Sequence, residues 1–158
     1  MMTLAAVDCG TNSLRLLISQ VEVVDGVLEI TELHRLMEIV RLGQGVDATG
    51  MLAPEALERV REALMKYAEL MQVEKVQAVR MVATSATRDA SNRDDFFAMT
   101  REILAPWGAE AEVISGDEEA ALSFRGAVDD LEPELGPYCV IDVGLSLIHI
   151  SEPTRRTP

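Results

Sequence analysis

The alternation of apolar, strand-like runs with amphipathic helical stretches limits the possible folds of this chain more than any other feature. Strands are expected at residues 4–7, 14–24, 27–40, 76–84, 111–115 and 137–142, and helices at residues 53–72, 91–108 and 116–128. In the first helix, apolar side chains recur at three- and four-residue intervals from Leu57 to Met71, and Pro54 occupies the first turn, where proline is favoured. Strands that alternate with helices indicate a layered α/β domain with parallel strand pairing.

The dipeptide Asp25–Gly26 separates the second and third strand-like runs. Asp-Gly between two extended segments is a strong signal for a two-residue hairpin, because a type I′ turn needs a positive φ at both positions. This hairpin makes the first strand pairing antiparallel. We therefore expect a mixed sheet of about five strands that is flanked by helices.

Composition narrows the class of partner. The chain has 158 residues, enough for one domain with a proper core, and 48% of them are hydrophobic, which excludes a disordered protein. Its formal net charge of −13 disfavours nucleic acid as a partner. The same charge disfavours a polyanionic substrate unless basic residues gather locally.

Several features predict a cytoplasmic protein that does not bind membranes. No apolar run approaches the ~18 residues that a membrane span needs. The N-terminus lacks the charged segment of a signal peptide. Cys9 and Cys139 both lie in apolar, strand-like runs, where buried free thiols are expected, as is usual in a reducing cytosol.

The first candidate site is the stretch "AAVDCGTNSLRLL". Asp8 follows a buried strand, and Gly10, Thr11, Asn12 and Ser13 form the turn after it. Successive backbone N–H groups in such a turn make a concave anion-binding site, and Asp8 could hold a hydrated divalent cation. The alternative is an ordinary hairpin turn that is capped by Asp8 and Asn12.

The second candidate is Arg88, in the stretch "MVATSATRDASN" after another apolar strand. We expect Arg88 to lie in a loop, where its guanidinium group could bind phosphate oxygens with two hydrogen bonds. The alternative is a surface arginine that caps a helix or pairs with Asp89.

The third candidate is the acidic helix start in "VISGDEEAALSF", with Asp117, Glu118 and Glu119. Acidic residues in a first turn complement the helix dipole, which is sufficient explanation for two of them. The third could face a cleft and activate a water molecule as a general base.

The fourth candidate is "VIDVG", which contains Asp142 and Gly144 and repeats the pattern of "AVDCG". Two such loops that face each other would hold opposite sides of a phosphate chain. Asp8 and Asp142 would then both lie near one metal ion.

These stretches, together with "EIVRLGQGVDATGMLAPEALER", resemble the exopolyphosphatase/guanosine-pentaphosphate phosphatase family over residues 4–144. That family belongs to the actin–Hsp70–sugar-kinase superfamily of two-lobed phosphotransfer folds. The segments "SATRDA" and "ISGDEEA" are specific to the family, whereas a D-x-G-T turn is shared with sugar kinases. The resemblance implies a ribonuclease H-like first lobe at residues 1–130 and the truncated start of a second lobe at residues 131–144.

The resemblance also implies an activity, which is the hydrolysis of a terminal phosphoanhydride in inorganic polyphosphate, guanosine pentaphosphate or both. Glu119 matches the general base for the attacking water, and Arg88 matches the arginine that contacts substrate phosphate. Glu118 would then be the helix-capping acid. The implied phosphate-binding residues are Gly10, Thr11, Asn12, Ser13, Arg88 and Gly144, and the implied Mg²⁺ ligands are Asp8 and Asp142.

The chain departs from the family after Gly144. Leu145 stands where relatives continue Asp-x-Gly-Gly-Gly-Ser-Thr-Glu, and "LSLIHISEPTR" resembles the translation of a transposase sequencing adaptor. We therefore expect residues 145–158 to be a non-native tail. The strand at residues 138–143 would then lack its sheet partners and be loosely attached, and the fragment would hydrolyse little or nothing.

Two other functions stay open at this point. The D-x-G-T turn would also fit an ATP-dependent kinase of the same superfamily, and phosphate loops without turnover would fit a non-catalytic module that binds alarmones or nucleotides. The full-length protein could form a homodimer.

Overall fold

The computed structural model of the protein describes residues 1–129 and 131–141. The chain divides into two compact units, Met1–Val113 and Ile114–Pro158, and each is described by itself. In the described residues, no helix combines the length and the apolar composition that a bilayer crossing requires.

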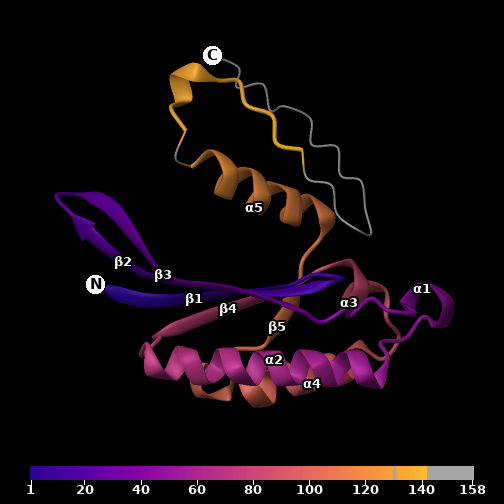
Figure 1. Ribbon diagram of the computed structural model, residues 1–158. Helices are drawn as coiled ribbons and strands as arrows, with labels where there is room; N and C mark the ends of the chain where they lie inside the picture. The colour runs from indigo at the N-terminus through magenta and orange to yellow at the C-terminus, as the bar shows by residue number, and fades with distance from the viewer. Residues whose placement is uncertain (130, 142–158) are drawn as a thin grey trace. The chain divides into compact units, whose positions relative to one another are not determined.

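The first unit is built on a five-stranded sheet with the strand order β3-β2-β1-β4-β5 (Figure 1). The strands are β1 Met2–Cys9, β2 Ser13–Val24, β3 Val27–Ile39, β4 Ala78–Ala83 and β5 Ala111–Val113. Strand β1 pairs antiparallel with β2 and parallel with β4. Strands β2 and β3 are antiparallel, and β4 and β5 are parallel. The predicted mixed sheet is confirmed.

The hairpin between β2 and β3 has the turn that the sequence predicts. Val24 and Val27 are its last paired residues, and Asp25 and Gly26 have φ values of 51° and 82°. Two positive φ values are the mark of a type I′ turn, which matches the natural twist of the two strands.

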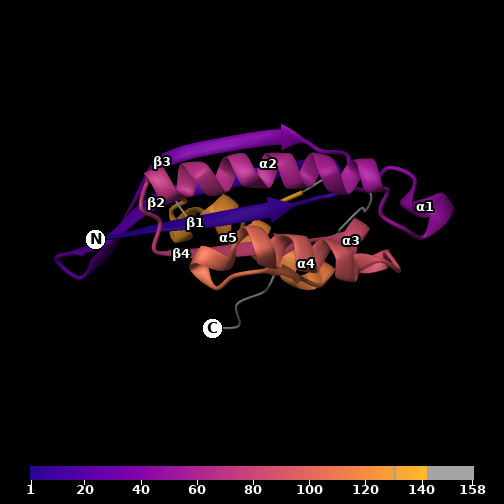
Figure 2. The ribbon, with the colours of Figure 1, turned by 90° about the horizontal axis from the view of Figure 1, so that it is seen from below.

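Helices α2 and α4 run side by side across one face of the sheet (Figure 2). The helical elements of the first unit are α1 Val46–Thr49, α2 Pro54–Val73, α3 Ser85–Asp89, α4 Arg93–Ile103 and the 3₁₀ turn η1 Ala105–Trp107. Helix α2 buries Val60, Leu64 and Tyr67, which lie at helical spacing on one side of it. The Tyr67 hydroxyl donates to the carbonyl oxygen of Leu14 at 2.9 Å and so joins α2 to β2.

Helix α4 is shorter than the sequence suggested, because a 3₁₀ turn replaces its predicted end. Pro106 lies in that turn, and proline cannot continue an α-helix, since it has no N–H group and its ring clashes with the preceding turn.

The described part of the second unit contains helix α5 Gly116–Val128 and the 3₁₀ turn η2 Pro133–Leu135. The strand predicted at residues 137–142 is wrong over residues 137–141, which lie in neither a helix nor a strand. A strand needs a neighbour for its backbone hydrogen bonds, and the described part of this unit supplies none. Cys139 is accordingly exposed instead of buried, whereas Cys9 is buried as predicted.

Candidate functional site

Two of the candidate segments begin side by side at one edge of the sheet. Strands β1 and β4 are adjacent and parallel, and their last paired residues are Cys9 and Ala83. The backbone N–H of Thr84 donates to the carbonyl oxygen of Cys9 at 3.3 Å. The carboxyl ends of parallel strands are where ligands bind in open α/β sheets, so this edge is the natural place for a site.

The turn after β1 is joined directly to α3. Within the turn, the Gly10 N–H donates to the Ser13 carbonyl oxygen at 3.0 Å. The hydroxyl oxygens Thr11 Oγ1 and Ser85 Oγ lie 3.2 Å apart and share a hydrogen bond. The structure therefore brings the first candidate loop into contact with the segment that carries Arg88.

Arg88 itself lies on the short helix α3, so the prediction that it lies in a loop is wrong. Its N–H donates to the Thr84 carbonyl oxygen at 3.2 Å, which closes the helical turn, and its side chain is half-buried. Five residues are too few to show a helical period, so no sequence pattern predicts this helix. On the same helix, the buried Thr87 Oγ1 has no hydrogen-bond partner among the described residues.

A third segment, residues 40–44, supports the first loop from the other side. The N–H groups of Val40 and Arg41 both donate to the Asn12 carbonyl oxygen at 2.9 Å, and that of Gly43 donates to the Thr11 carbonyl oxygen at 2.8 Å. We call residues 40–44 the supporting segment. The two glycines of "RLGQG" are the sequence signal for this segment, because glycine marks a position where backbones approach closely.

Helix α2 anchors the supporting segment through one side chain. Arg59 Nε donates to the Val40 carbonyl oxygen at 2.7 Å. Its Nη2 donates to the Arg41 carbonyl oxygen at 3.3 Å and to Gln44 Oε1 at 3.1 Å. The anchoring role of Arg59 could not be predicted from the sequence. Arg59 lies 15 to 19 residues from these acceptors, and no sequence pattern links positions that far apart.

Three arginines belong to the segments that adjoin the first loop, in spite of the acidic composition. Arg15 lies directly opposite Asp8 in the pairing of β1 with β2. Arg41 is bonded through its backbone to Asn12, and Arg88 follows on α3. Cross-strand neighbours on one face have Cβ atoms about 5 Å apart, so the side chains of Asp8 and Arg15 leave the same face of the sheet next to each other.

Asp8 lies near the end of β1 and is half-buried. The adjacent Cys9 points to the opposite, buried face, where burial and, secondly, the negative charge of Asp8 raise the pKa of its thiol. A single carboxylate such as Asp8 is compatible with a hydrated Mg²⁺, which binds few protein ligands and keeps several waters. The described residues contain no group of three or more His, Cys, Asp or Glu that could hold a metal, and Asp142 and Gly144 lie outside the described residues.

Glu119 lies in the second unit, in the first turn of α5. The Glu118 N–H donates to Ser115 Oγ at 3.1 Å, so Ser115 is the N-cap and Glu118 occupies the third helical position. Glu119 is one residue further round the helix and is half-buried, whereas Glu118 is exposed. The pattern S-x-x-E is the sequence signal for this cap. The role of Glu119 as general base stays a prediction.

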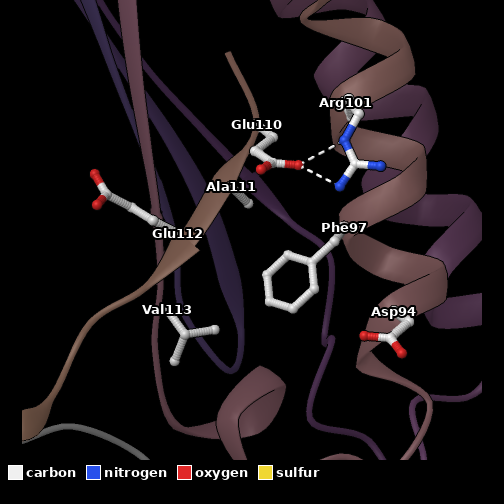
Figure 3. A pocket seen from close by; sticks show the side chains of 7 residues that line it. All are labelled: Asp94, Phe97, Arg101, Glu110, Ala111, Glu112 and Val113. Atoms are coloured by element: carbon white, nitrogen blue, oxygen red, sulfur yellow. Dashed lines mark hydrogen bonds and ion pairs between the residues drawn. The ribbon is translucent and has the colours of Figure 1, made fainter.

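A pocket of about 400 Å³ lies beside α4 and β5 (Figure 3). Its lining residues are Asp94, Phe97, Arg101, Glu110, Ala111, Glu112 and Val113. Arg101 Nη2 and Glu110 Oε2 form an ion pair at 2.6 Å, and Glu112 of the lining pairs with Arg80. The lining includes none of the predicted site residues.

Comparison with known proteins agrees with the fold. The sequence matches the Ppx/GppA phosphatase family over residues 19–152. It is 57% identical to "Exopolyphosphatase 2" of Mycobacterium tuberculosis over 142 residues, which are 89% of this chain and 44% of that protein. The chain therefore belongs to the Ppx/GppA phosphatase family.

Solved structures lead to the same fold. The crystal structure of an exopolyphosphatase-like protein matches with a TM-score of 0.76 and 41% sequence identity. The match covers 90% of this chain and 42% of the solved chain. The crystal structure of the Aquifex aeolicus member of the Ppx/GppA family matches with a TM-score of 0.70 and 30% sequence identity. The match covers 84% of this chain and 41% of the solved chain. The predicted first lobe is confirmed. The chain spans less than half the length of each of these relatives.

Proposed function

We propose that this chain forms the first lobe of a hydrolase that releases the terminal phosphate of inorganic polyphosphate, of guanosine pentaphosphate, or of both. The observation that carries the proposal is the hydrogen-bonded junction between Thr11 and Ser85. It joins a glycine turn suited to phosphate with the helix that carries Arg88. Membership of a phosphatase family supports the same reaction class.

Phosphoryl transfer asks a protein mainly to position the groups and to stabilise negative charge. In the proposed site, the backbone N–H groups of the turn and the Arg88 guanidinium would bind oxygens of the transferred phosphoryl group. Asp8, with Asp142, would hold Mg²⁺, which supplies positive charge next to these oxygens when it is bound. Glu119 would orient the attacking water and accept its proton.

The proposal includes the compartment and the partners. A cytoplasmic protein with a net charge of −13 would repel nucleic acid, and it would accept a polyphosphate only where Arg15, Arg41 and Arg88 offset that charge. In the family pattern, the residues after Gly144 complete the second phosphate loop, and this chain has Leu145 at that point. The 158-residue chain alone is therefore expected to release little phosphate.

A hybrid enzyme tests the proposal. In it, residues 1–144 of this chain precede the remaining part of exopolyphosphatase 2 of Mycobacterium tuberculosis, whose 57% identity favours a compatible junction. The hybrid is first shown to fold by circular dichroism and cooperative melting. Phosphate release is then measured with Mg²⁺ and either polyphosphate or guanosine pentaphosphate, and the Arg88→Met hybrid is measured beside it.

We expect the hybrid to release phosphate, and we expect the rate to be about 100-fold lower in the Arg88→Met hybrid. Consumption of ATP with a sugar acceptor, and no release from polyphosphate, would instead establish the kinase alternative. Tight nucleotide binding by a folded hybrid without any phosphate release would establish the regulatory module.

A further inference from the structure

The methyl group of Thr11 lies against Gly43. A Cβ atom added at Gly43 would overlap Thr11 Cγ2 and would lie 3.5 Å from the Cβ of Ala86. Gly43 does not have a φ in the left-handed region, so no positive φ calls for glycine at this position. What this position requires is therefore the absence of a side chain.

Gly43 also has little freedom to move away from Thr11. Its N–H donates to the Thr11 carbonyl oxygen at 2.8 Å, and its own carbonyl oxygen accepts from the Val46 N–H at 3.2 Å. A shift large enough to admit a methyl group at this position would break the first of these bonds. An alanine at position 43 would therefore displace the Thr11 side chain.

The two branches of the Thr11 side chain serve different contacts. Its methyl group lies against Gly43, and its hydroxyl oxygen lies 3.2 Å from Ser85 Oγ. Both branches sit on Cβ, so one torsion angle, χ1, places them together, and χ1 of a β-branched residue is stiff. Moving the methyl group away from position 43 would therefore also move the hydroxyl away from Ser85.

We infer that Gly43 is a positioning residue of the proposed active site. By leaving room for the Thr11 methyl group, it fixes the χ1 rotamer in which the Thr11 hydroxyl joins the phosphate loop to α3. Helix α3 carries Arg88, so this rotamer sets the position of the loop relative to the guanidinium group. The catalytic consequence rests on the proposed function, whereas the rotamer does not.

The rotamer is tested first, in the 158-residue chain. Three-bond couplings from Thr11 Cγ2 to the backbone nitrogen and carbonyl carbon report χ1 in solution. Gly126→Ala is the matched control, because no described atom lies within 4 Å of a Cβ added there. We expect one χ1 rotamer in the wild type and in Gly126→Ala, and different or averaged couplings in Gly43→Ala. Unchanged couplings in Gly43→Ala would overturn the inference.

The catalytic consequence is tested in the hybrid enzyme by a double-mutant cycle. Thr11→Ser removes the methyl group and keeps the hydroxyl, so an alanine at position 43 then meets no methyl. Gly43→Ala should lower kcat/KM for polyphosphate by about 100-fold when threonine is at position 11. In the Thr11→Ser background, the same change should alter kcat/KM by no more than about twofold.

All four hybrids are assayed below the temperature at which any of them begins to unfold, so that a general loss of stability does not enter the rates. An equal loss in both backgrounds would contradict a contact with the Thr11 methyl group. If the folded wild-type hybrid releases no phosphate, the proposed function fails, and the couplings of Thr11 still decide the rotamer.

Discussion

Replacing Arg59 by methionine should destabilise the first unit, because its guanidinium group anchors the supporting segment. The change removes a partly buried bond of 2.7 Å to the Val40 carbonyl oxygen and two exposed bonds of 3.3 and 3.1 Å. Methionine keeps most of the aliphatic stem, so lost packing contributes little. A hydrogen bond from a charged donor is worth about 1.5–3 kcal/mol, and exposed contacts contribute far less.

We therefore expect Arg59→Met to lower the free energy of unfolding by about 2 kcal/mol. For a chain of this size, such a loss lowers Tm by about 4–8 °C. Urea unfolding is followed by the fluorescence of Trp107, the single tryptophan of the sequence. Its indole N–H donates to the Val76 carbonyl oxygen at 2.9 Å, so its emission reports on the first unit.

Arg61→Met is the matched control on the same helix. The Arg61 guanidinium forms two exposed ion pairs, both of 3.7 Å, with Glu58 and Glu102. Exposed pairs of this kind contribute about 0.5 kcal/mol. Arg59→Lys should fall between the two variants, because an ammonium group cannot reach three acceptors. Equal, small losses in Arg59→Met and Arg61→Met would refute the anchoring role.

Two further predictions concern the core and the second unit. Burial raises the pKa of Tyr67 to about 12, so the free energy of unfolding should fall as pH rises from about 10 to about 12 and the hydroxyl loses its proton. Tyr67→Phe should make the urea midpoint depend less on pH over that range, and an unchanged dependence would contradict this. Ser115→Ala removes the acceptor of the Glu118 N–H and should cost α5 about 1 kcal/mol; amide exchange at Glu118 should become faster, and an unchanged exchange rate would show that the cap does not stabilise the helix.

The elements that were predicted correctly are those whose structure is specified by residues close together in the sequence. Asp25 and Gly26 specify their turn through their own φ values, so the hairpin follows from two letters of sequence. Helix α2 follows from the spacing of its buried side chains. The two segments of the candidate site, the turn after β1 and helix α3, were found because each follows an apolar strand, and the parallel pairing of β1 and β4 then brings them together.

The contacts that the sequence did not predict join residues far apart in the chain. Thr11 meets Ser85 across 74 positions. The requirement for glycine at position 43 comes from a methyl group 32 positions away, on Thr11, which no local pattern records. The strand at residues 137–141 was predicted from apolar composition alone, and composition does not specify whether a partner strand is available.

The central claim is that Glu119 activates the water that attacks the terminal phosphate. It is tested by the rate of phosphate release from polyphosphate by the hybrid enzyme, by its Glu119→Gln variant and by the control Glu118→Gln. Glutamine keeps the shape of the side chain and cannot accept the proton. The account predicts a fall in kcat of about 100-fold or more for Glu119→Gln and little change for Glu118→Gln. Undiminished turnover by Glu119→Gln would contradict it.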